Sequence, residues 1–173
     1  STLGTAQLID LARDLLAVGL QQARGLQDWH ALAAGLEQAA RELRLLCAGA
    51  LRDVRGLIKL RWDERARAEG WSAGLQSLAQ AAQAVAQALQ LTVEVGPDFE
   101  KLMQRAEAVA ALVDVFAAPT PADHVRWIDV SPQQARLVES PLDIREMLTE
   151  QRRATARTWN FTSATLRDDE SLG

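Results

Sequence analysis

The chain has 173 residues, of which 48% are hydrophobic and 24% are charged, and its net charge is -4 at pH 7. This length allows one ordinary domain, or a small domain with an added lobe, and a sizeable core. The acidic balance argues against a free-standing module for duplex DNA, because such modules are usually basic, but it permits a local basic patch.

The first two thirds of the chain are expected to be helical. Ala, Leu, Gln and Arg dominate and Tyr is absent, a bias that favours helix. Asp28 suits the N-cap of the second helix, and Thr5 or Thr2 that of the first. Gly96-Pro97-Asp98 breaks the chain before the fourth helix. Apolar residues at a spacing of 3.6 predict helices over about 5–24, 28–54, 72–92 and 98–117.

Residues 55–70 are less regular and predict a connection with a short helix or a hairpin. Positive charge is concentrated in and beside it, partly cancelled by Asp53, Asp63, Glu64 and Glu69. Trp62 lies within this stretch, and Trp71 directly follows it. The basic residues are Arg52, Arg55, Lys59, Arg61, Arg65 and Arg67.

The pattern changes after Pro121. Alternation over 124–130 and over 135–139, with a turn between them, predicts a β-hairpin. Ser140-Pro141 is typical of a helix start, with Ser140 as N-cap and Pro141 at N1, and this helix should reach about Arg153. A last strand is predicted over 158–161. The expected fold is mainly α, a helical bundle over 1–118 followed by a small, incomplete β-β-α-β piece over 119–173.

Both ends resemble boundaries within a longer protein. The chain opens on Ser1 without a Met and stops at Gly173 after a strand-like segment. Three strands do not make a well-covered α/β sheet, so we expect the rest of that sheet to lie outside this chain.

The most specific chemical signal is Thr162-Ser163-Ala164-Thr165-Leu166, which follows the last predicted strand. Ligands of α/β sheets usually bind at the carboxyl ends of strands. Hydroxyl groups there can exchange hydrogen bonds with a carboxylate, a water or a phosphate. The alternative interpretation is a polar cap on the next helix.

These residues and their surroundings resemble the DinG and YoaA branch of XPD-like helicases of superfamily two. Residues 161–166 are similar to the third motif of those helicases. The segments Val125-Arg126-Trp127-Ile128-Asp129 and 136–144 agree with the branch in order and spacing, and 8–16 and 96–99 are compatible with it.

The resemblance implies that the chain spans the helical arch insertion and the third motif of an ATP-dependent 5′-to-3′ DNA helicase for repair or replication stress. The whole helicase would use ATP, Mg and an iron–sulfur cluster. The motif coupling ATP state to DNA would fall on Thr162, Ser163, Ala164 and Thr165. This chain has no phosphate-binding Gly-x-x-x-x-Gly-Lys-Ser/Thr loop and no Asp-Glu-Ala-His motif, so we expect no catalytic residue here and no ATPase activity of the chain alone.

Arg61, Arg65 and Trp62 are the candidate DNA contacts, because cationic grooves with stacked aromatic rings hold single strands. We expect Arg61 and Arg65 to line the DNA side of the arch. The alternative is a solvated helix face with core tryptophans. A different class also stays open, namely a non-catalytic helical module that docks a replication or repair protein.

The remaining reactive residue types indicate no further site. The single cysteine, Cys47, cannot form an internal disulfide or a four-thiolate cluster and is expected to be a small buried hydrophobe. His30 and His124 have no neighbours with metal-ligand spacing, so no metal is expected. No stretch approaches the roughly 18 apolar residues of a membrane span, and no secretion signal is present, so we expect a cytoplasmic protein without a membrane partner.

Overall fold

A computed structural model of the chain describes residues 1–143. They fall into two compact units. The first consists of Ser1–Pro119 and Arg126–Glu139, and it contains the helices and most of the sheet. Of the second unit, 120–125 and 140–143 are described. The expected mainly α fold, a helical bundle with a small sheet, is confirmed.

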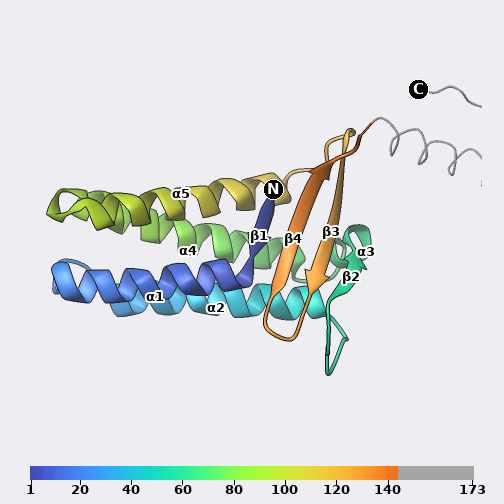
Figure 1. Cartoon of the computed structure of the whole chain (residues 1–173), viewed down its shortest axis with the longest axis horizontal. Coiled ribbons are helices and arrows are strands. Elements are labelled where there is room, and N and C mark those ends of the chain that lie inside the picture. The colour runs from blue at the N-terminus through green and yellow to red at the C-terminus, as the bar shows by residue number, and fades with distance from the viewer. Residues whose placement is uncertain (144–173) are drawn as a thin grey trace, which may run out of the picture. The chain divides into compact units, whose positions relative to one another are not determined.

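The four long helices lie side by side (Figure 1). Helix α1 pairs with α2, α2 with α4, and α4 with α5. A short helix, α3, precedes α4, and the 3-10 turn Val93–Val95 joins α4 to α5. The helix bounds are α1 Thr5–Gln22, α2 Trp29–Ala48, α3 Trp62–Ala66, α4 Trp71–Thr92 and α5 Pro97–Ala117.

The helix ends confirm two of the local predictions and correct two others. Asp28 is the N-cap of α2 and accepts a hydrogen bond from the Ala31 N–H at 3.1 Å, and Pro97 opens α5. Thr5 does not cap α1, because its hydroxyl accepts from the Ala135 N–H of a strand at 3.0 Å. Helix α2 ends six residues early, because Gly49 turns the backbone to φ 58°.

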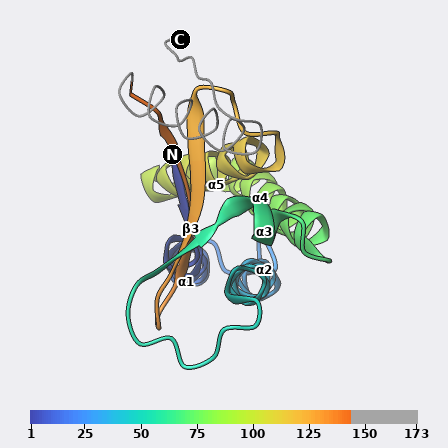
Figure 2. The ribbon, with the colours of Figure 1, turned by 90° about the vertical axis from the view of Figure 1, so that its right-hand side faces the viewer.

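Four strands form one antiparallel sheet in the order β1-β4-β3-β2. Thr2 pairs with Val138, and Lys59 pairs with Asp129. In Figure 2 the four long helices lie behind the strands. The strand bounds are β1 Thr2–Gly4, β2 Ile58–Arg61, β3 His124–Val130 and β4 Ala135–Pro141.

The predicted hairpin is confirmed as β3 and β4, but its partners come from an unexpected place. The prediction placed the rest of the sheet outside this chain, whereas β1 and β2 come from the segment predicted as bundle. The predicted helix start at Ser140 is wrong, because Ser140 and Pro141 are the last residues of β4. Pro141 is tolerated at a strand end, where its missing N–H interrupts little of the ladder. The predicted helix beyond 143 and the strand over 158–161 lie outside the described residues.

An ion pair on the inner side of the sheet joins it to the bundle. The Arg126 side chain on β3 is 2% exposed and donates to the Glu139 carboxylate on β4 at 2.7 Å. Its other nitrogens donate to the carbonyl oxygens of Val115 and Ala118 at 2.7 Å, at the end of α5. One side chain therefore donates to carbonyl groups at a helix end, where the helix itself supplies few donors.

In the second unit, Asp123 forms hydrogen bonds with two other described residues. Its carboxylate lies 2.8 Å from Nδ1 of His124, and its carbonyl oxygen accepts from the Leu142 N–H at 2.9 Å. The hydrogen bond with His124 lowers the pKa of the Asp123 carboxyl from its ordinary value.

Candidate nucleic-acid interface

The sheet has one face toward the helices and one face away from them. Burial alternates along β2 and β4, and Ile128 and Leu137 are buried in the core with Leu60 packed against it. We call the opposite side the outer face. Paired residues point to the same side, so its members follow from the register as Thr2 and Gly4 (β1), Lys59 and Arg61 (β2), Trp127 and Asp129 (β3), and Arg136 and Val138 (β4).

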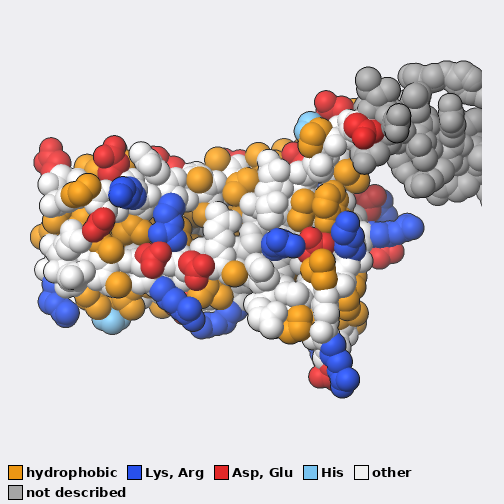
Figure 3. Space-filling model, in the orientation of Figure 1, with side chains coloured by type: hydrophobic (Ala, Val, Ile, Leu, Met, Phe, Trp, Pro, Cys, Tyr) orange, Lys and Arg blue, Asp and Glu red, His pale blue; other side chains and the backbone are white. Residues whose placement is uncertain are grey.

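Three cations lie on this face. Lys59 and Arg61 are exposed, and neither has an ion pair among residues 1–143. The third, Arg136, has a side chain that is 40% exposed. Figure 3 shows Lys and Arg side chains over the strand end of the molecule, with acidic side chains among them. The chain as a whole carries a net negative charge, whereas this face carries more positive than negative side chains. Its local charge therefore attracts phosphate.

Trp127 gives the outer face an aromatic ring. It is half-buried, and the Lys59 ammonium stands 4.7 Å from the ring centroid, in cation–π contact. Its indole N–H is buried and has no hydrogen-bond partner among the described residues. Trp127 and Arg61 are paired residues, so a cation and a ring stand directly across from one another.

Asp129 is the one acid among the outer-face residues. It is 6% exposed, and one carboxylate oxygen, Oδ2, accepts from Arg136 at 3.3 Å. The other oxygen, Oδ1, is buried and has no partner among the described residues. Gly4, opposite Arg136, leaves room for that side chain, since a Cβ there would lie 3.2 Å from its Cγ. A buried oxygen without a partner costs on the order of 1–3 kcal/mol, so this oxygen calls for an explanation.

The candidate DNA contacts named from the sequence lie in different places. Arg61 is on the outer face. Trp62 is 9% exposed and packs edge-on against Trp71, with ring centroids 5.4 Å apart, and against Phe116 at 5.7 Å. Because its ring is enclosed in the core, Trp62 offers no surface for a base in this structure.

Arg65 lies away from the outer face. Its guanidinium fills the space where a Cβ at Gly49 would stand, just past the end of α2. A cation there complements the negative end of the helix dipole. Thr162, Ser163, Ala164 and Thr165, which were expected to form the third helicase motif, lie outside the described residues.

Sequence reasoning did not name Trp127, Asp129 or Arg136 as site residues. The alternation of residues 124–130 could have identified the first two, because it places Trp127 and Asp129 on the opposite face of the strand from Arg126 and Ile128. Placing the cations beside them required the strand register, which the sequence did not supply.

The other reactive groups form no second site in the described part of the chain. Cys47 is fully buried, and burial raises the pKa of its thiol to about 12, so the thiol stays protonated and unreactive at neutral pH. Residues 1–143 contain no cluster of three or more His, Cys, Asp or Glu side chains. None of their helices is both long and apolar enough to cross a bilayer.

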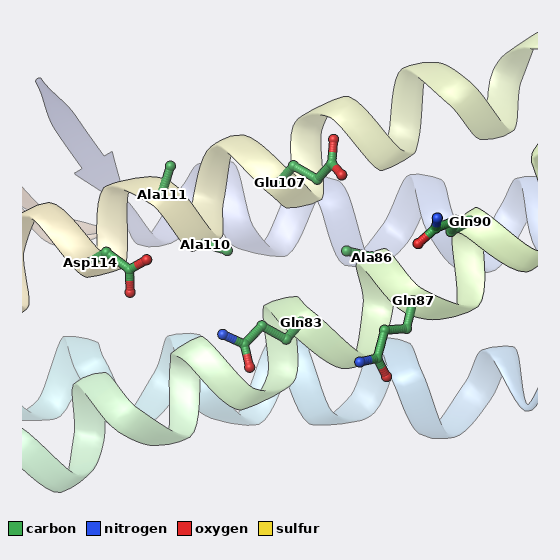
Figure 4. Close-up of a pocket in the computed structure, with 8 residues that line it drawn as sticks. All are labelled: Gln83, Ala86, Gln87, Gln90, Glu107, Ala110, Ala111 and Asp114. Carbon is green, nitrogen blue, oxygen red and sulfur yellow. The ribbon is translucent and has the colours of Figure 1, made fainter.

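A shallow groove runs between α4 and α5 and encloses about 410 Å³ (Figure 4). Amide side chains line it from α4, and the carboxylates of Glu107 and Asp114 line it from α5. Its lining has no cation, so it would repel a phosphate backbone. The groove is therefore a poor DNA site. The remaining lining residues are Gln83, Ala86, Gln87, Gln90, Ala110 and Ala111.

Comparisons of the chain with family models, with curated proteins and with solved structures found no match.

Proposed function

We propose that this chain is part of a DinG-like ATP-dependent DNA helicase and that the outer face of its sheet holds single-stranded DNA. The observation that carries the proposal is the set of three cations on one face, with Lys59 and Arg61 beside the half-buried ring of Trp127 and Arg136 beside Asp129. Single strands are held by cationic surfaces that also offer aromatic rings for base stacking. The similarity of 161–166 to the third helicase motif supports the same class of protein.

In this proposal the cations contact phosphates and Trp127 stacks on a base. For a single strand, the logarithm of the binding constant falls with the logarithm of salt concentration by about 0.7 for each neutralised phosphate. Three cations would therefore give a slope of about -2. Phosphate contacts and ring stacking are available to every nucleotide of a strand, as a strand that is being translocated requires.

ATP hydrolysis and 5′-to-3′ movement belong to the whole helicase in this proposal. The chain has neither the phosphate-binding loop nor the acidic Mg-binding motif. We therefore assign it a part in holding DNA and, through Thr162, Ser163, Ala164 and Thr165, in coupling nucleotide state to the DNA path.

The experiment is fluorescence anisotropy of a labelled single-stranded oligonucleotide with the purified chain at several salt concentrations. The wild-type chain should bind, and its affinity should fall with salt with a slope of about -2. Lys59→Glu/Arg61→Glu should bind much more weakly, because two of the three phosphate contacts become repulsive.

The matched control is Arg13→Glu/Lys101→Glu, which makes the same change of net charge at exposed positions on α1 and α5. This variant should keep most of the wild-type affinity. Equal losses in the two double variants would mean that net charge alone drives binding, and the outer face would lose its assigned role. No binding by the wild-type chain at low salt would exclude it as a DNA site.

The alternative function, a protein-interaction module, has one observation in its favour. The groove between α4 and α5 is lined by amides, small side chains and two acids, a mixture that suits a peptide with basic residues better than DNA. It lies on helices and not on the sheet, so both functions can exist in one protein.

A further inference from the structure

The unpaired oxygen of Asp129 lies among groups that would bind DNA. An acid on a phosphate-binding surface repels the DNA backbone. We therefore look for a favourable interaction that its carboxylate would make with DNA. Arg136 holds Oδ2 at 3.3 Å and leaves Oδ1 without a partner among the described residues. A carboxylate oxygen can only accept hydrogen bonds, so the group that would satisfy Oδ1 is a donor.

A stacked base brings such a donor to this place. Trp127 is two residues from Asp129 on the same strand, and both lie on the outer face. Successive residues on one face of a strand are separated by about 7 Å. A base on the Trp127 ring therefore has its hydrogen-bonding edge within reach of the neighbouring side chain.

We propose that Asp129 accepts a hydrogen bond from the amino group of a base stacked on Trp127, so that the outer face prefers cytosine to uracil. This inference rests on the proposed function. Asp and Glu pair with the N4 amino group of cytosine. The only donor on the edge of uracil, N3–H, is flanked by two carbonyl oxygens that repel a carboxylate.

Lys59 controls access to both groups. The backbone of Lys59 is directly opposite Asp129, and its ammonium stands over the Trp127 ring. The Lys59 side chain therefore extends from beside Asp129 to the ring of Trp127. This side chain is long and flexible, and one cation–π contact with a half-buried ring holds it only weakly. A phosphate that draws the ammonium away uncovers the ring for stacking and opens the way to Oδ1.

The test compares oligo(dC) with oligo(dU) of equal length by fluorescence anisotropy at one salt concentration. Both are flexible pyrimidine strands without a 5-methyl group, so they differ mainly in the edge that Asp129 would contact. The wild-type chain should bind oligo(dC) about tenfold more tightly, as one good base contact provides.

The variant Asp129→Asn should reverse the preference. Arg136 only donates hydrogen bonds, so the amide turns its carbonyl oxygen toward Arg136 and places its NH₂ where Oδ1 was. That NH₂ donates to O4 of uracil and has no acceptor at N4 of cytosine. Asp10→Asn, on the exposed side of α1, removes the same charge and should keep the preference for oligo(dC).

Circular dichroism of both variants serves as the control for folding, and their spectra should match that of the wild-type chain. Reversal in Asp129→Asn, with Asp10→Asn unchanged, supports the proposal. Equal, salt-dependent binding of oligo(dC) and oligo(dU) by the wild-type chain overturns the inference about Asp129 and leaves the proposed function standing. Failure to bind either oligonucleotide overturns the proposed function and this inference together.

Discussion

Arg126 connects more parts of the molecule than its position on a strand would indicate. Its guanidinium donates to Glu139 and to carbonyl oxygens at the end of α5, and it lies 5.2 Å from the Trp62 ring and 5.4 Å from the Phe116 ring. Buried ion pairs gain little over a well-packed apolar pair, but removing one partner leaves an uncompensated charge. The pair therefore specifies how the sheet meets the bundle.

Arg126→Met should lower the free energy of unfolding by about 3–5 kcal/mol, because Glu139 and the α5 carbonyl groups lose their donor. Urea denaturation followed by circular dichroism measures it. The double variant Arg126→Met/Glu139→Met should recover part of the loss. As a control, Arg105→Met removes one partner of an ion pair with Asp14 that is exposed on both sides, and it should cost less than about 1 kcal/mol. Equal costs for Arg126→Met and Arg105→Met would contradict the assigned role of Arg126.

The contact between α1 and α2 depends on a single glycine. Gly19 is buried on α1, and a Cβ there would lie 2.4 Å from Cδ2 of Trp29. Trp29 is 1% exposed and its indole N–H donates to the Ala23 carbonyl oxygen at 2.9 Å, so the ring is held in place. The two helices approach closely because this position carries no side chain.

Gly19→Ala should destabilise the protein by about 1–3 kcal/mol, the usual cost of an overfilled core. The matched control is Gly35→Ala on α2, where a Cβ meets nothing within 4 Å. That substitution should stabilise by up to about 1 kcal/mol, because alanine favours helix. Urea midpoints of both variants provide the measurement, and effects of the same sign would contradict the close approach at Gly19.

The bundle and the sheet share one core. Leu3 on β1, Ile128 on β3 and Leu137 on β4 are each 0% exposed and belong to the same cluster as the helix seams. The helices therefore bury part of their apolar surface against strands that come from both ends of the described chain. Neither layer has a complete core of its own.

A chain of residues 1–118 should consequently be much less stable than a chain of residues 1–143. It lacks β3 and β4, and with them the partners of β1 and β2 and the guanidinium of Arg126. We expect helical circular dichroism, a lower urea midpoint and binding of a dye specific for exposed apolar surface. Equal midpoints for the two chains would mean that the bundle folds independently of the sheet.

The parts of this structure that were predictable from the sequence have local causes. Apolar residues three and four apart predicted the long helices, and Asp28 and Pro97 start theirs through groups only a few residues away. The hairpin of β3 and β4 was predictable for the same reason, because its alternation and its turn lie within a short segment.

Strands β1 and β2 were missed because they are three and four residues long and become strands only through distant partners. Thr2 pairs with Val138, a contact across most of the described chain. The candidate site divides in the same way. The charge of Arg61 marked it in the sequence, whereas its place beside Trp127 and near Asp129 depends on the register of β2 against β3.

Local sequence was thus sufficient for the helical class, the hairpin and the presence of a basic segment, since each depends on neighbours a few residues apart. The fold was needed to place Trp62 in the core and Arg65 at the end of α2, and to bring Lys59, Trp127 and Asp129 onto one face. The physical reason is that burial and cross-strand pairing depend on residues far apart in the chain, whose meeting no local pattern specifies.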